Sequence, residues 1–548
     1  MSHSSQRIPA TEASFRRRSS GVLLHVTSLP GRHGSGDLSA AAFQFIDFLA
    51  AAGQSWWQML PVGPPGDPPG NSPYSSCSSV AGSPHLVSLE VLYQEGWLTR
   101  REVQPDREFD PGQVRFSLVR AYRERRLRKA WERFRAAPLS RRHAFADFCA
   151  EHRHWLDDFA LFCALKRQFG RAPWPEWPRE LRSRQPAALA DARHSAQVEL
   201  DYHRWVQFQF HRQWAALRRY ARERGVALIG DVPICVSHDS ADVWAHPELF
   251  TLDRLGRPTR ISGYPPDDFC RRGQRWGHPL YRWPAHRRTG FRWWTARLAG
   301  AYRLFDAVRL DHFLGFTRLW SIPASARTAQ QGRWIKTPGR ELLSAVRGVL
   351  GRRPMIAEDL GHVTRADIVL RDDFGIPPMR ILQWGLGPGD PLHRPHRFTP
   401  HTVAYTGTHD THTTVGWYHR LTPRARKAVR EYAGSDGRQI HRDLIRLALN
   451  SAANLVIIPV QDLLGLNERA RMNRPGTATG NWAWRVRPDA LPPAVARDLR
   501  RLTELAERLA VVGRPYGLVS SRQTPRIQLS QKQDYAREPG RLLPCLGQ

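Results

Sequence analysis

Three carboxylates follow short apolar runs at widely separated places in the chain. Asp311 ends the segment VRLD, Glu358 lies in MIAED, and Asp410 lies in YTGTHD. Burying a charged side chain next to an apolar run costs free energy, so a carboxylate at such a position suggests a function. Two carboxylates that flank a glycosidic bond can cleave it, because one attacks or stabilises the anomeric carbon while the other protonates the leaving oxygen. A third can bind sugar hydroxyls and strain the ring.

Each of these carboxylates also has a structural explanation. An aspartate at a strand end often caps the next helix or pairs with an arginine, and Arg309 lies two residues before Asp311. For any one residue, the structural and the catalytic explanations are equally good. Three such residues, each at the end of a different apolar run, favour a shared catalytic site.

The elements that must position these residues are short, continuous apolar runs. Runs of this kind are typical of parallel strands covered on both faces, and helical patterns lie between most of them, as at residues 40–52 and 205–224. Eight strand–helix units predict an α/β protein with a (β/α)8 TIM barrel, whose catalytic groups sit at the C-terminal ends of the strands. The runs cover residues 21–29, 56–62, 226–234, 304–311, 354–360, 378–384, 402–410 and 455–463.

Uneven spacing of the runs predicts insertions in the barrel. The gap from residue 56 to residue 226 far exceeds a strand–helix unit, and residues 116–134 and 155–169 within it have helical patterns. The segment Gly263–Trp283 has the composition of a long loop, whereas residues 385–400 show no helical period, so one barrel helix is expected to be missing or very short. The expected domains are a disordered tail at 1–19, a catalytic barrel at 20–513 with a helical insertion at about 90–200 and an active-site loop insertion at about 235–300, and a C-terminal tail at 514–548.

Composition excludes several classes of protein. The chain has 548 residues, of which 41% are hydrophobic and 24% charged, as in globular proteins. No apolar stretch approaches the ~20 residues of a membrane span, so we expect no membrane association. The six cysteines form neither a CxxC pair nor a zinc-type cluster, and we expect free thiols in a reducing cytoplasm.

The net charge of +32 raises the question of a nucleic-acid partner. Only five of the 82 basic residues are lysines, and the arginines are spread over the whole chain rather than gathered in one tract. This distribution favours a coding bias toward arginine on solvated faces over a dedicated polyanion site. We therefore expect no specific nucleic-acid partner.

A set of motifs in a fixed order extends from about residue 20 to residue 510. It includes HVTSLPGRHGSGDL at 25–38, NSPYSS at 71–76, GDVPICVSHDSADVWAHPELF at 230–250, GYPPDDFCRRGQRWGHPLYRW at 263–283, FDAVRLDHFLGF at 305–316, MIAEDLG at 355–361, YTGTHDT at 405–411 and PVQDLLGLNERARMNRPGTATGNWAWR at 459–485. In these motifs the chain resembles the 4-α-glucanotransferases of the amylomaltase (disproportionating enzyme) family, glycoside hydrolase family 77. One motif alone is weak, but the set is highly specific.

The resemblance implies a retaining double displacement. By position, Asp311 would be the nucleophile, Glu358 the general acid and then the base, and Asp410 the residue that binds the 2- and 3-hydroxyls and favours the distorted glucose. Arg309 is suited to keeping Asp311 charged, and His409 is placed to donate to the same sugar. A buried structural histidine is the alternative for His409.

The resemblance also implies further substrate-binding residues. Tyr74 would form a platform under the reacting glucose with Ser72 beside it, and Gln274 and Trp276 would meet the acceptor glucose, unless Trp276 only packs its loop against the barrel. Asp231 and Asn473 match cleft positions, and either could be structural. The substrates implied are an α-1,4-glucan donor and a glucose or maltooligosaccharide acceptor, with no cofactor and no metal. Nothing in the sequence indicates the oligomeric state.

The chain departs from the family pattern at several positions near the site. The family has Arg where this chain has Leu314, and Asn with an acidic residue where it has Thr411 and His412. His278 replaces an Asn, and Pro68 and Pro69 stand where an aromatic residue is common. These changes leave two alternatives open, an α-glucan hydrolase of the α-amylase clan and an inactive glucan-binding relative.

Overall fold

The structure is a computed structural model and describes residues 15–66, 71–267 and 270–509. The predicted C-terminal tail at 514–548 lies outside the described residues, as do the first fourteen residues of the predicted N-terminal tail. Pro68 and Pro69 lie outside them as well.

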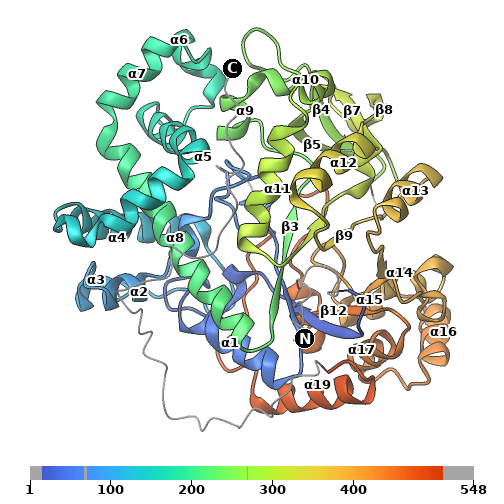
Figure 1. Cartoon of the computed structure of the whole chain (residues 1–548). Coiled ribbons are helices and arrows are strands. Elements are labelled where there is room, and N and C mark those ends of the chain that lie inside the picture. The colour runs from blue at the N-terminus through green and yellow to red at the C-terminus, as the bar shows by residue number, and fades with distance from the viewer. Residues whose placement is uncertain (1–14, 67–70, 268–269, 510–548) are drawn as a thin grey trace, which may run out of the picture. The chain divides into compact units, whose positions relative to one another are not determined.

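Eight parallel strands of the described chain form one sheet that curves into a barrel (Figure 1). Their order is β10-β11-β12-β1-β2-β3-β6-β9, and a parallel bridge from Ala357 in β9 to Pro378, next to β10, closes the ring. The predicted (β/α)8 barrel is confirmed, with each strand inside or overlapping its predicted run. The strands are β1 (Ser19–Leu23), β2 (Trp56–Gln58), β3 (Ala227–Val232), β6 (Ala307–Leu310), β9 (Met355–Ala357), β10 (Met379–Ile381), β11 (Val403–Tyr405) and β12 (Leu455–Pro459).

The strands are apolar because both of their faces are covered. In β12, every residue from Leu455 to Pro459 is buried. Leu455 and Ile457 belong to a small cluster with residues of the other strands, whereas the alternate residues Val456 and Ile458 join the large cluster shared with the helices. Since neighbouring residues of a strand point to opposite faces, the first set fills the barrel and the second packs outward.

Helices cover the outside of the barrel (Figure 1). After β10 only the four-residue α14 (Leu382–Gly385) and two 3-10 turns precede β11, which confirms the expected loss of a full barrel helix there. The other helices that follow barrel strands are α1 (Ala40–Ala51), α8 (Gln197–Glu223), α11 (Arg292–Leu304), α12 (Gly339–Leu350), α13 (Arg365–Asp373), α15 (Thr414–Arg420), α16 (Pro423–Ala433), α17 (Ile440–Asn450), α18 (Val460–Leu463) and α19 (Pro493–Leu505).

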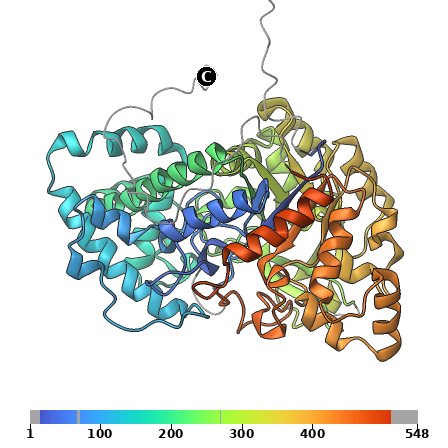
Figure 2. The ribbon, with the colours of Figure 1, turned by 90° about the horizontal axis from the view of Figure 1, so that it is seen from below.

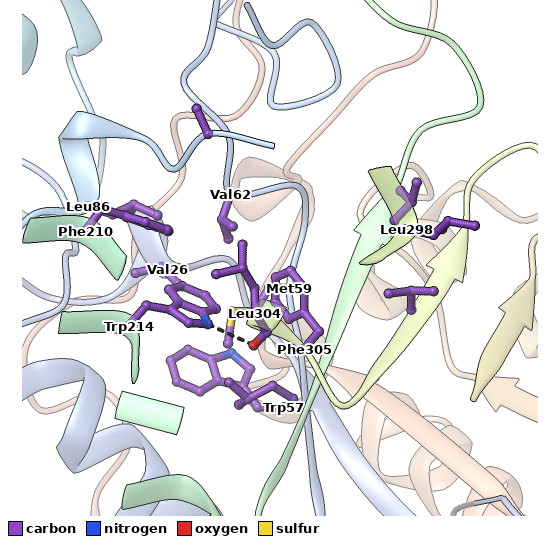
Figure 3. Close-up of a cluster of buried hydrophobic side chains, with 14 of the residues drawn as sticks. Val26, Trp57, Met59, Val62, Leu86, Phe210, Trp214, Leu298, Leu304 and Phe305 are labelled. Atoms are coloured by element: carbon purple, nitrogen blue, oxygen red, sulfur yellow. Dashed lines mark hydrogen bonds between the residues drawn. The ribbon is translucent and has the colours of Figure 1, made fainter. Parts of the chain in front are cut away.

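Aromatic side chains fill the layer between the barrel and helices α8 and α11 (Figure 3). Trp57 on β2 and Trp214 on α8 are both almost completely buried. The indole N–H of Trp214 donates to the carbonyl of Leu304 at the end of α11, at 2.8 Å. Each buried indole removes a large apolar surface from water while its N–H keeps a partner, which fixes these helices against the strand ends.

A group of helices lies between β2 and β3 in the chain and gathers on one side of the barrel, opposite α13 and α16 (Figures 1 and 2). It comprises α2 (Leu89–Gln94), α3 (Arg100–Val103), α4 (Phe116–Arg135), α5 (His143–Gln168), α6 (Arg179–Arg182) and α7 (Pro186–Ser195). Helices α4 and α5 contain the two predicted helical patterns. The boundaries of a separate helical domain stay a prediction.

A second, antiparallel sheet was not expected from the sequence. Its order is β5-β4-β7-β8, formed by β4 (Arg260–Tyr264), β5 (Gln274–Pro279), β7 (Arg318–Pro323) and β8 (Arg333–Lys336). The expectation of a long loop over Gly263–Trp283 is wrong where β5 pairs with β4. Gly263 permits this pairing, since a Cβ there would lie 2.1 Å from the carbonyl oxygen of Gln274.

Two short helices, α9 (Ala241–Ala245) and α10 (Trp283–Arg288), flank the β4–β5 pair in the chain. None of the helices in the described ranges combines the length and the apolar character that crossing a membrane requires.

Candidate active site

Three carboxylates lie at the C-terminal ends of barrel strands, the end at which barrel active sites form. Asp311 follows β6, Glu358 follows β9, and Asp410 lies in the loop after β11. Their side chains keep 22%, 17% and 34% of their surface exposed, respectively. All three are therefore partly open to solvent rather than sealed in the interior.

The guanidinium of Arg309, on β6, joins two of these carboxylates. Its Nη2 lies 3.2 Å from Oδ1 of Asp311 and 2.9 Å from Oε1 of Glu358. Two oxygens that share one nitrogen at these distances lie at most about 6 Å apart, which suits a retaining glycosidase and is below the range of inverting ones. Nη1 of Arg309 pairs with Oδ2 of Asp231, on β3, and both of these side chains are almost completely buried.

The charges of this cluster alter its protonation. Burial and the Glu358 carboxylate raise the pKa of Asp311 well above its usual range, although Arg309 opposes the rise. Burial also raises the pKa of Asp231. Arg309 acts on Asp311 in the expected direction, but its one positive charge is divided among three carboxyl groups. Asp311 therefore retains a proton more readily than an isolated carboxylate does.

Asp410 has a different environment. Nε2 of His409 lies 3.1 Å from its Oδ2, and the side-chain amide of Asn473 donates to its Oδ1 at 2.6 Å. Although burial opposes the effect, His409 and Asn473 hold the pKa of Asp410 well below its usual range. The pKa of Asp410 is thus lowered whereas that of Asp311 is raised, so the two groups are suited to different tasks.

Tyr74 connects the two halves of the site. Its hydroxyl donates to Oδ2 of Asp231 at 2.7 Å and lies 2.7 Å from Nε2 of His409. Its ring stacks on the imidazole of His409 with centroids 5.5 Å apart, and the ring of Trp482 lies against it at 5.6 Å. Oγ of Ser72 accepts the backbone N–H of Tyr74 at 3.2 Å. Tyr74 thus forms an aromatic surface between Asp231 and Asp410.

Gln274 and Trp276 lie on β5 and reach the catalytic carboxylates through His312. The ring of Trp276 meets that of His312 edge-on at 4.9 Å, and the indole N–H of Trp276 donates to Oε1 of Gln274 at 3.1 Å. His312 has a left-handed backbone, with φ at 48°, and its amide N–H donates to Oε2 of Glu358 at 2.6 Å. The antiparallel sheet therefore contacts the site beside Glu358.

The structure brings most of the predicted site residues into one connected group. Ser72 joins it through Tyr74, and Gln274 and Trp276 join it through His312. The residues with direct polar contacts to one another are Tyr74, Asp231, Arg309, Asp311, Glu358, His409, Asp410 and Asn473.

Sequence reasoning assigned no role to His312, Arg471 or Trp482, which also belong to this group. His312 follows Asp311 directly, and Arg471 donates to the backbone carbonyl of Asp410 at 2.8 Å. All three lie inside motifs that carry the family resemblance. For His312 and Arg471, closeness in sequence to Asp311 and to Asn473 is the signal that could have identified them.

The departures from the family pattern occupy defined places. Leu314 is completely buried, and Oγ1 of Thr411 accepts the backbone N–H of Thr408 at 2.9 Å. His412 pairs with Glu468, with 2.8 Å between Nδ1 and Oε1. Burial lowers the pKa of His278 to about 4, so this histidine is neutral at pH 7. None of these four side chains replaces a catalytic carboxylate.

Comparisons with known proteins agree with this geometry. The family model of glycoside hydrolase 77, described as 4-alpha-glucanotransferase, matches residues 24–491. The chain is 45% identical over 503 residues to the 4-alpha-glucanotransferase of Thermus thermophilus. The aligned residues cover 90% of this chain and 99% of that protein. It is 43% identical over 500 residues to the 4-alpha-glucanotransferase of Synechocystis, and the aligned residues cover 90% of this chain and 98% of that protein.

Among solved structures, the fold is similar to that of the amylomaltase from Streptococcus agalactiae in complex with acarbose, with a TM-score of 0.87 and 36% identity over 90% of this chain and 100% of that one. The family model covers most of the chain, and the relatives match it over nearly their whole length. The chain therefore belongs to the 4-alpha-glucanotransferases of glycoside hydrolase family 77.

Proposed function

We propose that this 4-alpha-glucanotransferase moves α-1,4-glucan segments between maltooligosaccharides or starch-like glucans by a retaining double displacement. One observation carries the proposal. Arg309 contacts both Asp311 and Glu358 through a single nitrogen, which keeps the two carboxyl groups at a separation that suits direct attack by one of them. An inverting enzyme needs room for a water molecule between its carboxylates and the sugar.

In the first step, Glu358 gives its proton to the glycosidic oxygen while a carboxylate oxygen of Asp311 attacks the anomeric carbon. The bond between that carbon and the leaving oxygen breaks, and a covalent glucosyl ester forms on Asp311. The raised pKa of Asp311 and its contact with Glu358 support a pair that holds one proton between two carboxyl groups. The reaction starts from the state in which Glu358 carries this proton and Asp311 is ionised.

In the second step, Glu358 takes the proton of an acceptor 4-hydroxyl, and the resulting oxygen displaces Asp311 from the anomeric carbon. Two displacements restore the α configuration. We assign the 2- and 3-hydroxyls of the reacting glucose to Asp410 and His409, with Tyr74 beneath the ring. The lowered pKa of Asp410 supports this role, because a fixed negative charge stabilises the positive charge that develops on the sugar.

Transfer requires that an acceptor sugar reaches the glucosyl ester before water does. We assign acceptor binding to Trp276 and Gln274. Trp276 contacts the ring of His312, whose backbone N–H donates to Glu358. An indole face offers a stacking surface for a sugar, and covering the site excludes water. The donor is then an α-1,4-glucan and the acceptor a glucose or maltooligosaccharide.

We further propose that residues 20–513, with the insertions at about 90–200 and 235–300, form one catalytic domain that works in the cytoplasm without a specific nucleic-acid partner. The cysteines of the described ranges are free thiols, which supports a reducing compartment. Many arginines are used inside the fold, as in the buried pairs of Arg123 with Asp37 and of Arg371 with Asp359, which supports a structural origin of part of the charge.

Incubation of the purified enzyme with maltotriose tests the function. We expect glucose together with a ladder of longer maltooligosaccharides, measured by anion-exchange chromatography. The Asp311→Asn variant should lose transfer by at least about 1,000-fold, because the nucleophile is gone. Glucose without longer products would indicate the alternative hydrolase, and unchanged transfer in Asp311→Asn would refute the assigned nucleophile.

A further inference from the structure

Arg471 binds the backbone of Asp410 rather than its carboxylate. Its Nη2 donates to the backbone carbonyl of Asp410 at 2.8 Å, and its Nε donates to the carbonyl of Asn473 at 2.7 Å. Asn473 in turn donates its side-chain amide to Oδ1 of Asp410 at 2.6 Å. One guanidinium thus fixes both the backbone of Asp410 and the residue that orients its carboxylate.

The remaining nitrogen of the same guanidinium meets a histidine and a glutamate. Nη1 of Arg471 lies 3.0 Å from Nδ1 of His412 and 3.3 Å from Oε1 of Glu468. Nδ1 of His412 lies 2.8 Å from that same Oε1. A single imidazole nitrogen therefore faces a donor and an acceptor together. It can accept from Arg471 only without a proton, and it can donate to Glu468 only with one.

We propose that Arg471 is a positioning residue for Asp410 and that protonation of His412 releases it. The proposal rests on the assignment of Asp410 to the reacting glucose. With His412 neutral, the positive charge of Arg471 faces the negative charge of Glu468 and no other charge lies between them. A proton on His412 places a second positive charge about 3 Å from Nη1 of Arg471 and offers Glu468 a competing partner. Arg471 is then displaced from its place, and its hold on the backbone of Asp410 and on Asn473 weakens.

The surroundings of His412 determine the direction of the pH effect. Burial and the positive charges of Arg471 and Arg420 lower the pKa of His412, against the raising effect of Glu468. The charged groups that face this histidine are thus Glu468, Arg471 and Arg420, and Arg474 lies 4.0 Å from Glu468 on its far side. His412 is therefore neutral at pH 7 and gains a proton only below the usual titration range of a histidine. Its side chain is 31% exposed, so protons reach it from solvent.

The test compares kcat and KM on maltotriose between pH 4.5 and pH 8 in the wild type and in His412→Asn. Asparagine can accept from Arg471 and donate to Glu468 at every pH, because it carries no titratable proton. At pH 5 we expect the variant to retain at least about threefold more of its own neutral-pH kcat than the wild type does. KM should change less than kcat, because Asp410 acts mainly on the distorted sugar.

His396→Asn is the matched control. This exposed histidine contacts Tyr432 through Nδ1 at 2.9 Å and lies outside the site, so its variant should keep the wild-type profile. Arg471→Ala should lower kcat at pH 7 by about 10-fold or more, and Arg471→Lys should restore part of it. If Arg471→Ala does not fold, the pH profile of kcat in His412→Asn is sufficient to test the proposal.

Superimposable pH profiles of the wild type and His412→Asn would overturn the proposal. The Asp410→Asn variant, measured in parallel, separates this failure from a failure of the proposed function. Loss of transfer in Asp410→Asn together with superimposable profiles would reject only the role of His412. Full transfer in Asp410→Asn would reject the assignment of Asp410 itself.

Discussion

At the scale of single residues, the division of one positive charge among several carboxylates shapes the site. Arg309 contacts Asp231, Asp311 and Glu358, so it cannot neutralise all of them. The remaining negative charge and burial raise the pKa of Asp311. Asp410 has its own partners in His409 and Asn473 and needs no such proton. In the proposed mechanism these three carboxylates supply an acid, a nucleophile and a fixed anion.

The geometry of Arg309 leads to a prediction for Arg309→Lys. Lysine keeps the charge, but its single nitrogen cannot hold Asp231 on one side and the catalytic pair on the other. We expect kcat/KM on maltotriose to fall by about 100-fold, which corresponds to roughly 3 kcal/mol of lost transition-state stabilisation. Steady-state kinetics, with a melting curve to verify folding, measures the effect.

Arg287→Lys is the matched control for this substitution. Arg287 forms an exposed pair with Glu341 at 2.7 Å, and exposed pairs contribute little. Its variant should keep wild-type kinetics. A fall of less than about twofold in Arg309→Lys would mean that the fork of Arg309 is not needed to hold the pair.

At the scale of elements, the antiparallel sheet brings the acceptor side of the site to the barrel. Strand β5 carries Gln274 and Trp276, and β4 carries Tyr264, whose hydroxyl accepts the N–H of His362 at 2.8 Å. His362 follows Glu358 by four residues, so the sheet is bonded to the loop that carries the acid. The aromatic rings of Trp276 and Tyr264 both meet His312 edge-on. The sheet therefore lies against this side of the site through specific contacts, and we call it the cover.

This cover predicts the outcome of Trp276→Ala. Removal of the indole takes away the stacking surface for the acceptor and lets water reach the glucosyl ester. We expect the ratio of hydrolysis to transfer on maltotriose to rise by about 10-fold, while cleavage of the donor continues. Quantified reducing ends and product ladders give this ratio.

Trp334→Ala serves as the matched control, because Trp334 lies on β8 of the same sheet and packs against Trp320 with ring centroids 5.2 Å apart. Its loss tests whether any damage to the sheet has the same effect. An equal rise in both variants would contradict a specific role of Trp276 toward the acceptor.

At the scale of the whole molecule, the barrel was predictable and the second sheet was not. The barrel strands are buried on both faces, as β12 is at every residue, so they appear as continuous apolar runs. In β5 (QRWGHP) and β8 (RWIK), exposed residues interrupt the apolar ones, and no such run exists. Their stability comes from pairing with β4 and β7, which the local pattern does not encode.

Part of the site could likewise be predicted from the sequence, and part of it could not. Asp311, Glu358 and Asp410 could be grouped from the sequence, because the ends of parallel barrel strands meet at one face. The link between His412, Glu468 and Arg471 could not, because Glu468 lies 56 positions after His412 and only the fold brings them together. The raised pKa of Asp311 could not be predicted either, since it depends on burial and on the nearby Glu358 carboxylate, which only the fold determines.

The central claim is that Asp311 attacks the sugar while Glu358 moves the proton, and trapping the glucosyl ester tests it most directly. An α-maltosyl fluoride needs no acid to leave, so Glu358→Gln should form the ester but release it slowly. Mass spectrometry should show one added maltosyl unit on the peptide with Asp311 and none in the Asp311→Asn, Glu358→Gln double variant. A maltosyl unit on any other residue, or no adduct under turnover conditions, would contradict the account.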